Sequence, residues 1–207
     1  MNFDFSYQEL LLAAGGVCLA GLWLRRYFPW EYYQAEIRLS RIVRDLKFPA
    51  SVDQKLRESY PHLNDKNIAK IRDALREYFY LCQDAGKSEL AMPSRVAGVA
   101  WQGFIDAGGE YEVFCQQAFG RLLPYSKAEG LFPSEKTQNQ IRLRRTWNRA
   151  CAFYDLPADD PVILPDLFAL DRDLAIPDGF HYSLDEYDKK GRKIEKIEDM
   201  PFGFVKD

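Results

Sequence analysis

The sequence predicts a mainly α-helical protein: a single N-terminal transmembrane helix, then one compact helical domain with a small C-terminal β-hairpin. Two observations support this fold class. An uninterrupted apolar segment runs from Leu10 to Leu24, and much of the later chain carries apolar residues at helical spacing. The alternation of strands and helices that is typical of doubly wound folds is missing. We therefore expect a membrane anchor in residues 1–30, a juxtamembrane amphipathic helix and connection in 31–60, and a helical domain in 61–207.

The apolar segment is slightly short for a membrane-spanning helix. Its 15 residues extend about 22 Å as a helix, whereas the hydrocarbon core is roughly 30 Å thick. Its length is therefore also consistent with a buried core helix or a membrane-surface helix. The segment is apolar on every face, which favours spanning, because a surface helix needs a polar side. Aromatic residues that suit the headgroup level extend it on both sides: Phe3, Phe5, Tyr7, Tyr27, Phe28 and Trp30.

Basic residues predict the orientation of this helix. None precedes residue 25, whereas six follow soon after: Arg25, Arg26, Arg38, Arg41, Arg44 and Lys47. By the positive-inside rule, the N-terminus lies outside and the body is cytoplasmic. A cleaved signal peptide fits less well, because its first residues should be basic and these contain only Asp4 and Glu9.

A juxtamembrane amphipathic helix is expected from residue 31 to residue 46. Its apolar stripe consists of Ala35, Leu39, Ile42, Val43 and Leu46. Arg38, Arg41 and Arg44 share another side, which faces either an anionic leaflet or water. We treat these three and Arg25 and Arg26 as membrane-proximal. A proline-bounded connection around Pro49 and Pro61 follows.

Helical periodicity predicts four longer helices in the body. The first covers residues 65–83 with Asn64 as N-cap, and the second begins after Ser94 and ends before the Gly108–Gly109 pair. The others cover residues 110–119 and 134–153. A short helix fits the sequence DLFALDRDLA, between Pro165 and Pro177. The segments FHYSLDEY and RKIEKI, separated by DKKG, predict the terminal hairpin.

Charge and cysteine usage exclude several function classes. The chain from residue 25 onward has 28 basic and 29 acidic residues, a net charge of −1, which gives no footprint for nucleic acid. Four cysteines (Cys18, Cys82, Cys115 and Cys151) are widely spaced without a CxxC pair, so we expect reduced thiols and no zinc site. Basic residues from Arg142 to Arg149 contrast with acidic residues from Asp155 to Asp178. This contrast indicates either intramolecular complementarity or a charged docking face.

No catalytic, cofactor-binding or metal-ligating set is predicted. His62 and His181 are the only histidines, and too few for a zinc site. Ser94 and Ser134 resemble helix caps more than nucleophiles. Asp106 and Glu110 flank the double glycine, where they either share a cleft as an acid–base pair or, more simply, cap a helix. The candidate surface or pocket therefore consists of Trp101, Gln102, Asp106, Glu110 and Tyr125.

Part of the chain resembles a known family. The segments HLNDKNIAKIRDALREYFYLC, MPSRVAGVAWQGFIDAGGEYEVFCQQAFGRLLPY and LPDLFALDRDLAIPDGFHYSLD are similar to the poorly characterised bacterial glycine-rich-domain-containing-protein-like family. The family pattern, approximately VDxxWHxFI and later FLHH, implies an acid and histidine set. Here Gly98 replaces the Asp, Gln102 the His after Trp101, and Pro124 and Tyr125 the His pair. The resemblance implies a bacterial protein that lacks the family's polar set, and the predicted anchor then places it in the bacterial inner membrane.

Two functions from different classes remain. The first is a membrane-anchored, cytoplasm-facing protein-interaction module, in a scaffold or toxin-neutralising role, that contacts membrane lipid and a protein partner but no nucleic acid. The second is an enzyme with a divergent site around residues 101–125. The missing histidine and metal patterns favour the first, because a catalytic site requires converging functional groups.

Overall fold

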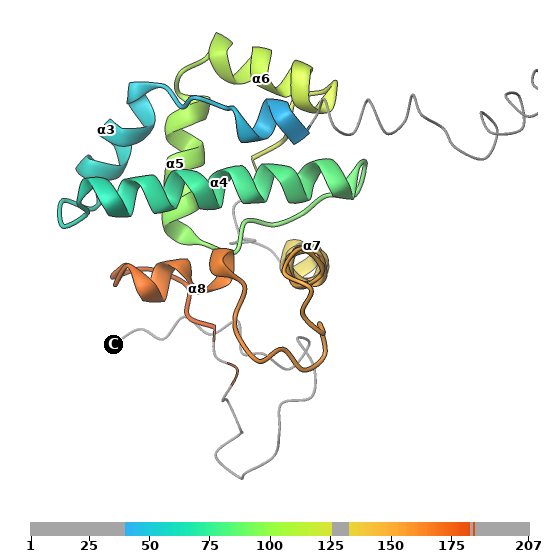
Figure 1. Ribbon diagram of the computed structural model, residues 1–207. Coiled ribbons are helices and arrows are strands. Elements are labelled where there is room, and N and C mark those ends of the chain that lie inside the picture. The colour runs from blue at the N-terminus through green and yellow to red at the C-terminus, as the bar shows by residue number, and fades with distance from the viewer. Residues whose placement is uncertain (1–39, 126–132, 183, 185–207) are drawn as a thin grey trace, which may run out of the picture. The chain divides into compact units, whose positions relative to one another are not determined.

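The computed structural model describes residues 40–125, 133–182 and 184. All of them belong to the compact unit that begins at Ser40. Residues 40–44 are helical. The later helices, shown in Figure 1, are α3 (Ala50–Ser59), α4 (Asp65–Ala85), α5 (Arg95–Ile105), α6 (Gly109–Phe119), α7 (Pro133–Phe153) and α8 (Asp166–Asp173). No strand occurs in the described ranges, so the mainly helical class is confirmed for this part of the chain.

Several sequence predictions lie outside the described residues. These are the apolar segment 10–24, residues 31–39 of the juxtamembrane helix, and most of the terminal hairpin. Residues 180–182, at the start of the expected hairpin, contain no strand. Across the ranges that are described, no helix combines the length and the apolar character needed to cross a membrane.

Helix α4 is the centre of the described unit. In Figure 1, α7 and α8 lie below it and α5 crosses it, and it contacts α5, α7 and α8. Its buried residues recur every three or four positions, and Ile71, Leu75 and Phe79 are fully inaccessible to solvent. The Asn64 side chain accepts a hydrogen bond from the Asn67 N–H at 2.9 Å, so the predicted cap is confirmed.

The predicted connection between Pro49 and Pro61 is wrong, because most of it forms α3. Both prolines lie outside the helix, so neither removes an internal hydrogen bond. Val52 and Leu56, one turn apart, are fully buried. This helix packs tightly on α5 at Gly103, where a Cβ atom would come within 3.0 Å of the Val52 Cα.

The boundaries of α5 and α6 follow local chemistry. Ser94 Oγ accepts a hydrogen bond from the Ala97 N–H at 3.2 Å, so it caps α5 as expected. Gly108 and Gly120 bound α6, and both have φ of 65°, a conformation that glycine adopts at little cost. The helices predicted for residues 110–119 and 134–153 and near residue 166 are confirmed as α6, α7 and α8.

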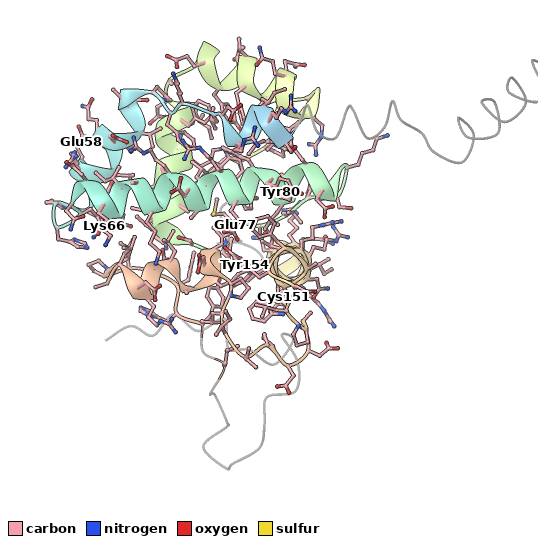
Figure 2. All side chains as sticks on the ribbon, viewed as in Figure 1. Glu58, Lys66, Glu77, Tyr80, Cys151 and Tyr154 are labelled. Atoms are coloured by element: carbon pink, nitrogen blue, oxygen red, sulfur yellow. The ribbon has the colours of Figure 1, made fainter. Side chains whose placement is uncertain are left out.

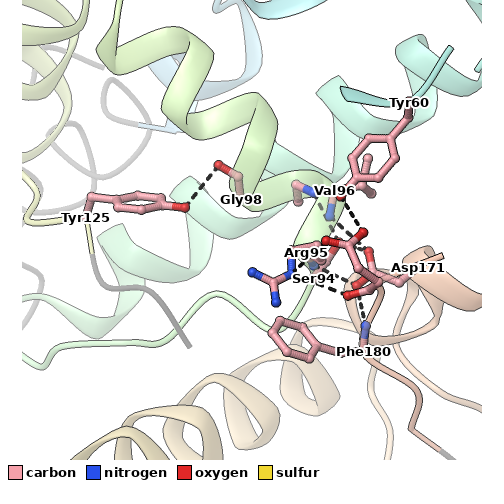
Figure 3. A network of polar contacts seen from close by, with 10 residues as sticks. Tyr60, Ser94, Arg95, Val96, Gly98, Tyr125, Asp171 and Phe180 are labelled. Carbon is pink, nitrogen blue, oxygen red and sulfur yellow. Dashed lines mark hydrogen bonds and ion pairs between the residues drawn. The ribbon is translucent and has the colours of Figure 1, made fainter. Parts of the chain in front are cut away.

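A buried carboxylate joins α8 to the start of α5 (Figure 3). Asp171 is 1% exposed and accepts four hydrogen bonds. The donors are the Ser94 hydroxyl (2.6 Å) and the N–H groups of Arg95 (2.6 Å), Val96 (3.1 Å) and Phe180 (2.8 Å). Gly179 lies so close that a Cβ atom there would be 2.7 Å from the Asp171 Cβ. Asp171 therefore fixes three chain segments together.

Candidate ligand pocket at Glu77

A cavity of about 520 Å³ opens beside the central helix α4. This volume lies within the range of ligand pockets in proteins, roughly 300–1,000 Å³. Its walls come from residues 40–44, α4, the end of α7 and α8. The lining residues are Ser40, Val43, Arg44, Lys70, Asp73, Ala74, Arg76, Glu77, Tyr80, Phe153, Tyr154, Asp166 and Leu170. We call this cavity the Glu77 pocket.

Glu77 is the partly buried acidic group of the Glu77 pocket. The Tyr154 hydroxyl donates a hydrogen bond to Glu77 Oε2 at 2.7 Å, and Figure 2 shows the two side chains near one another beside α7. The other oxygen, Oε1, is buried and has no hydrogen-bond partner in the described part of the chain. Burial raises the pKa of Glu77 to about 7, and the Tyr154 hydrogen bond opposes that rise. Glu77 therefore exchanges its proton near neutral pH.

Tyr154 and Asp166 complete the acidic side of the pocket. Burial raises the pKa of Tyr154 far above its usual value, and the hydrogen bond to Glu77 and the charge of Asp166 add to that rise. Tyr154 is thus a permanent hydroxyl donor. Asp166 lies in the first turn of α8 and is exposed. Its charge also contributes to the raised pKa of Glu77.

The basic residues of the Glu77 pocket already have partners. Lys70 Nζ lies 3.0 Å from Asp173 Oδ2, and Arg44 pairs with the neighbouring Asp45 at 3.1 Å. Arg76 pairs with Asp73 at 2.6 Å and donates to the Leu46 carbonyl. By contrast, neither Glu77 nor Asp166 forms an ion pair within the described residues. The unpaired charge of the Glu77 pocket is therefore negative.

Two exposed aromatic rings border the pocket. Tyr80 is 37% exposed and Phe153 is 48% exposed, and their ring centroids are 5.3 Å apart. Figure 2 places Tyr80 further along α4 than Glu77. Exposed aromatic side chains beside a cavity are typical of contact surfaces, since they bury a large area at little entropic cost.

The predicted residues Trp101 and Tyr125 lie together, but Trp101 belongs to the core. It is 1% exposed and donates through Nε1 to the Tyr111 hydroxyl at 3.1 Å. The ring centroids of Trp101 and Tyr125 are 5.0 Å apart, and the Tyr125 hydroxyl donates to the Gly98 carbonyl at 3.4 Å (Figure 3). Both line a second cavity of only about 170 Å³, less than most ligand pockets offer.

The other predicted residues lie at the surface. Asp106 accepts hydrogen bonds from Lys55 Nζ at 2.9 Å and from Gln102 Nε2 at 3.0 Å. These contacts, Lys55 foremost, hold the pKa of Asp106 below its usual value. Glu110 is exposed in the first turn of α6. Asp106 and Glu110 do not line either cavity described above.

The membrane-proximal arginines, His62 and the cysteines lie away from both cavities or outside the described residues, except Arg44, which lines the Glu77 pocket, and Cys82, which lines the second cavity. Arg41 and Arg44 are exposed, while Arg25, Arg26 and Arg38 lie outside the described residues. His62 Nε2 lies 3.2 Å from the Leu174 carbonyl, a packing role. Cys82, Cys115 and Cys151 are free and buried, as predicted. Among the described residues, no group of three or more His, Cys, Asp or Glu side chains is placed to hold a metal ion.

Apart from Arg44, which was predicted as membrane-proximal, and the acid of α8, which belongs to the predicted acidic stretch, sequence reasoning assigned no role to the charged and aromatic residues of the Glu77 pocket. One signal was available for Glu77, which lies three residues after Ala74 and four before Leu81, in a stripe of buried positions. An acidic residue in such a stripe is unusual unless it has a partner or a function. Nothing local links Glu77 to Tyr154, since 77 residues separate them in the sequence.

Comparison with known proteins identifies a family. The model of the UCP032817-like family matches residues 38–200, which is most of the chain. The chain therefore belongs to the UCP032817-like family. No curated protein matches it, and neither does any solved structure.

Proposed function

We propose that this member of the UCP032817-like family is a membrane-tethered, cytoplasm-facing protein-interaction module. In this proposal its helical body holds a protein partner at the Glu77 pocket and at the aromatic rings beside it. The observation that carries the proposal is a ligand-sized cavity with a buried, unpartnered carboxylate oxygen and exposed aromatic side chains. Such a combination of apolar surface and a few polar groups is typical of binding sites.

In the sequence, a short connection separates the first pocket residue from the proposed anchor. Ser40 and Arg44 line the pocket, and residues 25–40 connect it to the apolar segment that ends at Leu24. As a helix, that connection would extend about 24 Å. A bacterial inner membrane crossed by residues 10–24, with the N-terminus outside, would thus keep the pocket within reach of other proteins at the cytoplasmic face.

Lipid contact beside the pocket forms part of the same proposal. Arg41 and Arg44 are exposed on the short helix that borders the pocket. Together with Arg25, Arg26 and Arg38 they would form a basic surface after the anchor. Juxtamembrane basic residues gain about 1 kcal/mol each from an anionic leaflet. The expected loss of a resembling family's acid and histidine set at Gly98, Gln102, Pro124 and Tyr125 favours an interaction module over an enzyme.

Site-specific photo-crosslinking tests the proposal. A photoreactive amino acid replaces Tyr80 in the full chain in native membranes, and a matched variant carries it at Val113, which is 56% exposed on α6. We expect one defined protein adduct from position 80 and none from position 113. Reporter fusions at the two termini should place only the C-terminus in the cytoplasm. A cytoplasmic N-terminus, or identical adducts from both positions, would contradict the proposal.

An enzyme is the second candidate, and the pKa of Glu77 favours it. A carboxyl group that titrates at about 7 is suited to general acid–base catalysis at neutral pH. Asp106, one of the two candidate acids of the 101–125 region, is ion-paired with Lys55 and has a lowered pKa, which suits that role less. A turnover reaction that depends on a group of pKa near 7 and falls by at least about 100-fold in Glu77→Gln would favour the enzyme.

A further inference from the structure

We infer that the Glu77 pocket receives a Lys or Arg side chain of the protein partner, whose cationic head pairs with Glu77 and Asp166. The aliphatic stem of that side chain lies against the apolar and aromatic walls. This inference rests on the proposed function, and it names the chemistry that the partner must present.

Charge complementarity is the first argument. The three basic side chains of the pocket are held by Asp45, Asp73 and Asp173. Glu77 and Asp166 keep no cationic partner among the described residues, although Tyr154 connects them electrostatically. An incoming cation would compensate both carboxylates, whereas an incoming carboxylate or phosphate would meet an unpaired negative wall.

The hydrogen-bonding state of Glu77 is the second argument. The Tyr154 hydroxyl holds Oε2 at 2.7 Å, so the carboxylate is anchored by one oxygen. The second oxygen, Oε1, is buried and has no donor among the described residues. The terminal torsion of a Glu side chain has a broad minimum, so in this inference the carboxyl group rotates to bring Oε1 to the incoming donor. An ammonium brings three N–H donors and a guanidinium five, so either satisfies this oxygen and still reaches Asp166.

The walls of the pocket suit the stem of such a side chain. Val43, Ala74 and Leu170 supply aliphatic surface. Tyr80 and Phe153 present rings at the border, and aromatic faces attract cations as well as methylene groups. These rings also offer contact area to the residues beside the basic side chain, which favours a protein partner over a free amine.

The test measures binding of a small probe to the full chain in lipid nanodiscs. The probe is Nα-acetyl-lysine N-methylamide, observed by saturation-transfer NMR. Its neutral counterpart carries an acetyl group on Nζ. We expect binding of the charged probe at least tenfold tighter than the neutral one. Glu77→Gln should lose about tenfold in affinity, and Asp166→Asn a few-fold. Glu112→Gln, at an exposed position of α6 outside the pocket, is the matched control and should bind like wild type.

The affinity for the charged probe should rise about tenfold from pH 6 to pH 8, because Glu77 must lose its proton near pH 7. The groups that surround it are Tyr154, Asp166, Lys70, Asp73, Arg76 and Arg44. The pKa of Tyr154 is raised further from this range. This rise of affinity with pH should be lost in Glu77→Gln.

The outcomes separate this inference from the proposed function. Equal binding of both probes, or unchanged binding by Asp166→Asn and folded Glu77→Gln, overturns the inference even if Tyr80 crosslinks a partner. If the probe binds with the expected variant pattern but Tyr80 forms no protein adduct, the pocket is a cation site and the proposed protein partner is contradicted. An adduct between Tyr80 and residues 189–196 of the same chain, which contain Lys189, Lys190, Arg192, Lys193 and Lys196, would also overturn the inference.

Discussion

Asp171 is a buried carboxylate and Glu77 a partly buried one, and their carboxyl groups differ sharply in hydrogen bonding. Asp171 accepts four hydrogen bonds, three of them from backbone N–H groups. Glu77 accepts one, from a side chain, and within the described part of the chain its other oxygen has no partner. A saturated carboxylate holds the fold together and has no capacity for a ligand. The unsaturated one costs stability in the isolated protein, and the proposed function assigns it a partner.

The position of each carboxylate in its fold explains this difference. Asp171 faces the first turn of α5, where N–H groups have no partner within the helix and the helix dipole favours a negative charge. Glu77 is inside α4, whose backbone N–H groups are used by the helix itself. Only another side chain can serve it, and Tyr154 provides a single hydroxyl. Variants of the two sites therefore test how the number of hydrogen bonds to each carboxylate affects the stability of the protein.

The largest effect is expected for Asp171→Ala. The change leaves three N–H groups and the Ser94 hydroxyl without their acceptor and separates α8 from α5. We expect the free energy of unfolding to fall by about 3–5 kcal/mol, measured by chemical denaturation. Asp159→Ala, at an exposed position, is the control and should change it by less than about 0.5 kcal/mol. A loss below about 1 kcal/mol for Asp171→Ala would contradict the structural role.

Glu77→Gln should change how stability depends on pH. The pKa of Glu77 is about 7 in the folded chain against 4.5 as its ordinary value, so the folded state binds more protons between these values. The wild type therefore loses about 3 kcal/mol of unfolding free energy as pH rises from 4.5 to 7, and then levels off. The difference between wild type and Glu77→Gln, measured across this range, should follow that loss. A difference that is independent of pH would contradict the raised pKa.

A smaller loss is expected for Tyr154→Phe, which removes the one donor to Glu77. The pKa of Glu77 should rise above 7, because the Tyr154 hydrogen bond is what lowers it. Stability at pH 8 should fall by about 1–3 kcal/mol, since the ionised acceptor is then buried without a donor. NMR titration of the Glu77 carboxyl measures the first effect. Tyr80→Phe, on the same helix and outside this contact, should leave that titration unchanged.

The smallest effect is expected from relieving backbone strain at Ala175, four residues after Asp171. Ala175 has φ of 51°, a left-handed conformation directly after the C-cap of α8. Glycine adopts it more readily, so Ala175→Gly should raise the unfolding free energy by about 0.5–1 kcal/mol. Thermal unfolding measures this gain. A decrease would show that the Ala175 methyl group contributes packing that outweighs the strain.

The sequence alone was sufficient where local chemistry defines an element. Asn64 and Ser94 mark helix starts because their side chains bond to the first N–H groups. The apolar spacing of α4 is long enough to exclude alternatives. Helix α3 was missed because only Val52 and Leu56 are buried in it, which is too short a pattern to outweigh the prolines on either side.

The candidate site was harder to predict, because tertiary packing creates it. Trp101 and Tyr125 were chosen as aromatic candidates and do meet, yet Trp101 is buried and the cavity there is small. Glu77 and Tyr154 come from α4 and from the end of α7, and no spacing rule relates them. The unusual acidic residue on a buried stripe predicts that something must compensate it, but not which residue does.

Alkylation of the buried cysteines offers a way to measure how often the folded body opens. Burial raises the pKa of Cys82 to about 12 and that of Cys151 to about 11, and it also raises the pKa of Cys115. An alkylating reagent reacts with the thiolate, so the folded body should be almost inert and only opened molecules should be modified. In a Cys18→Ser background, the labelling rate would therefore report how often the body opens under native conditions, without heat or denaturant.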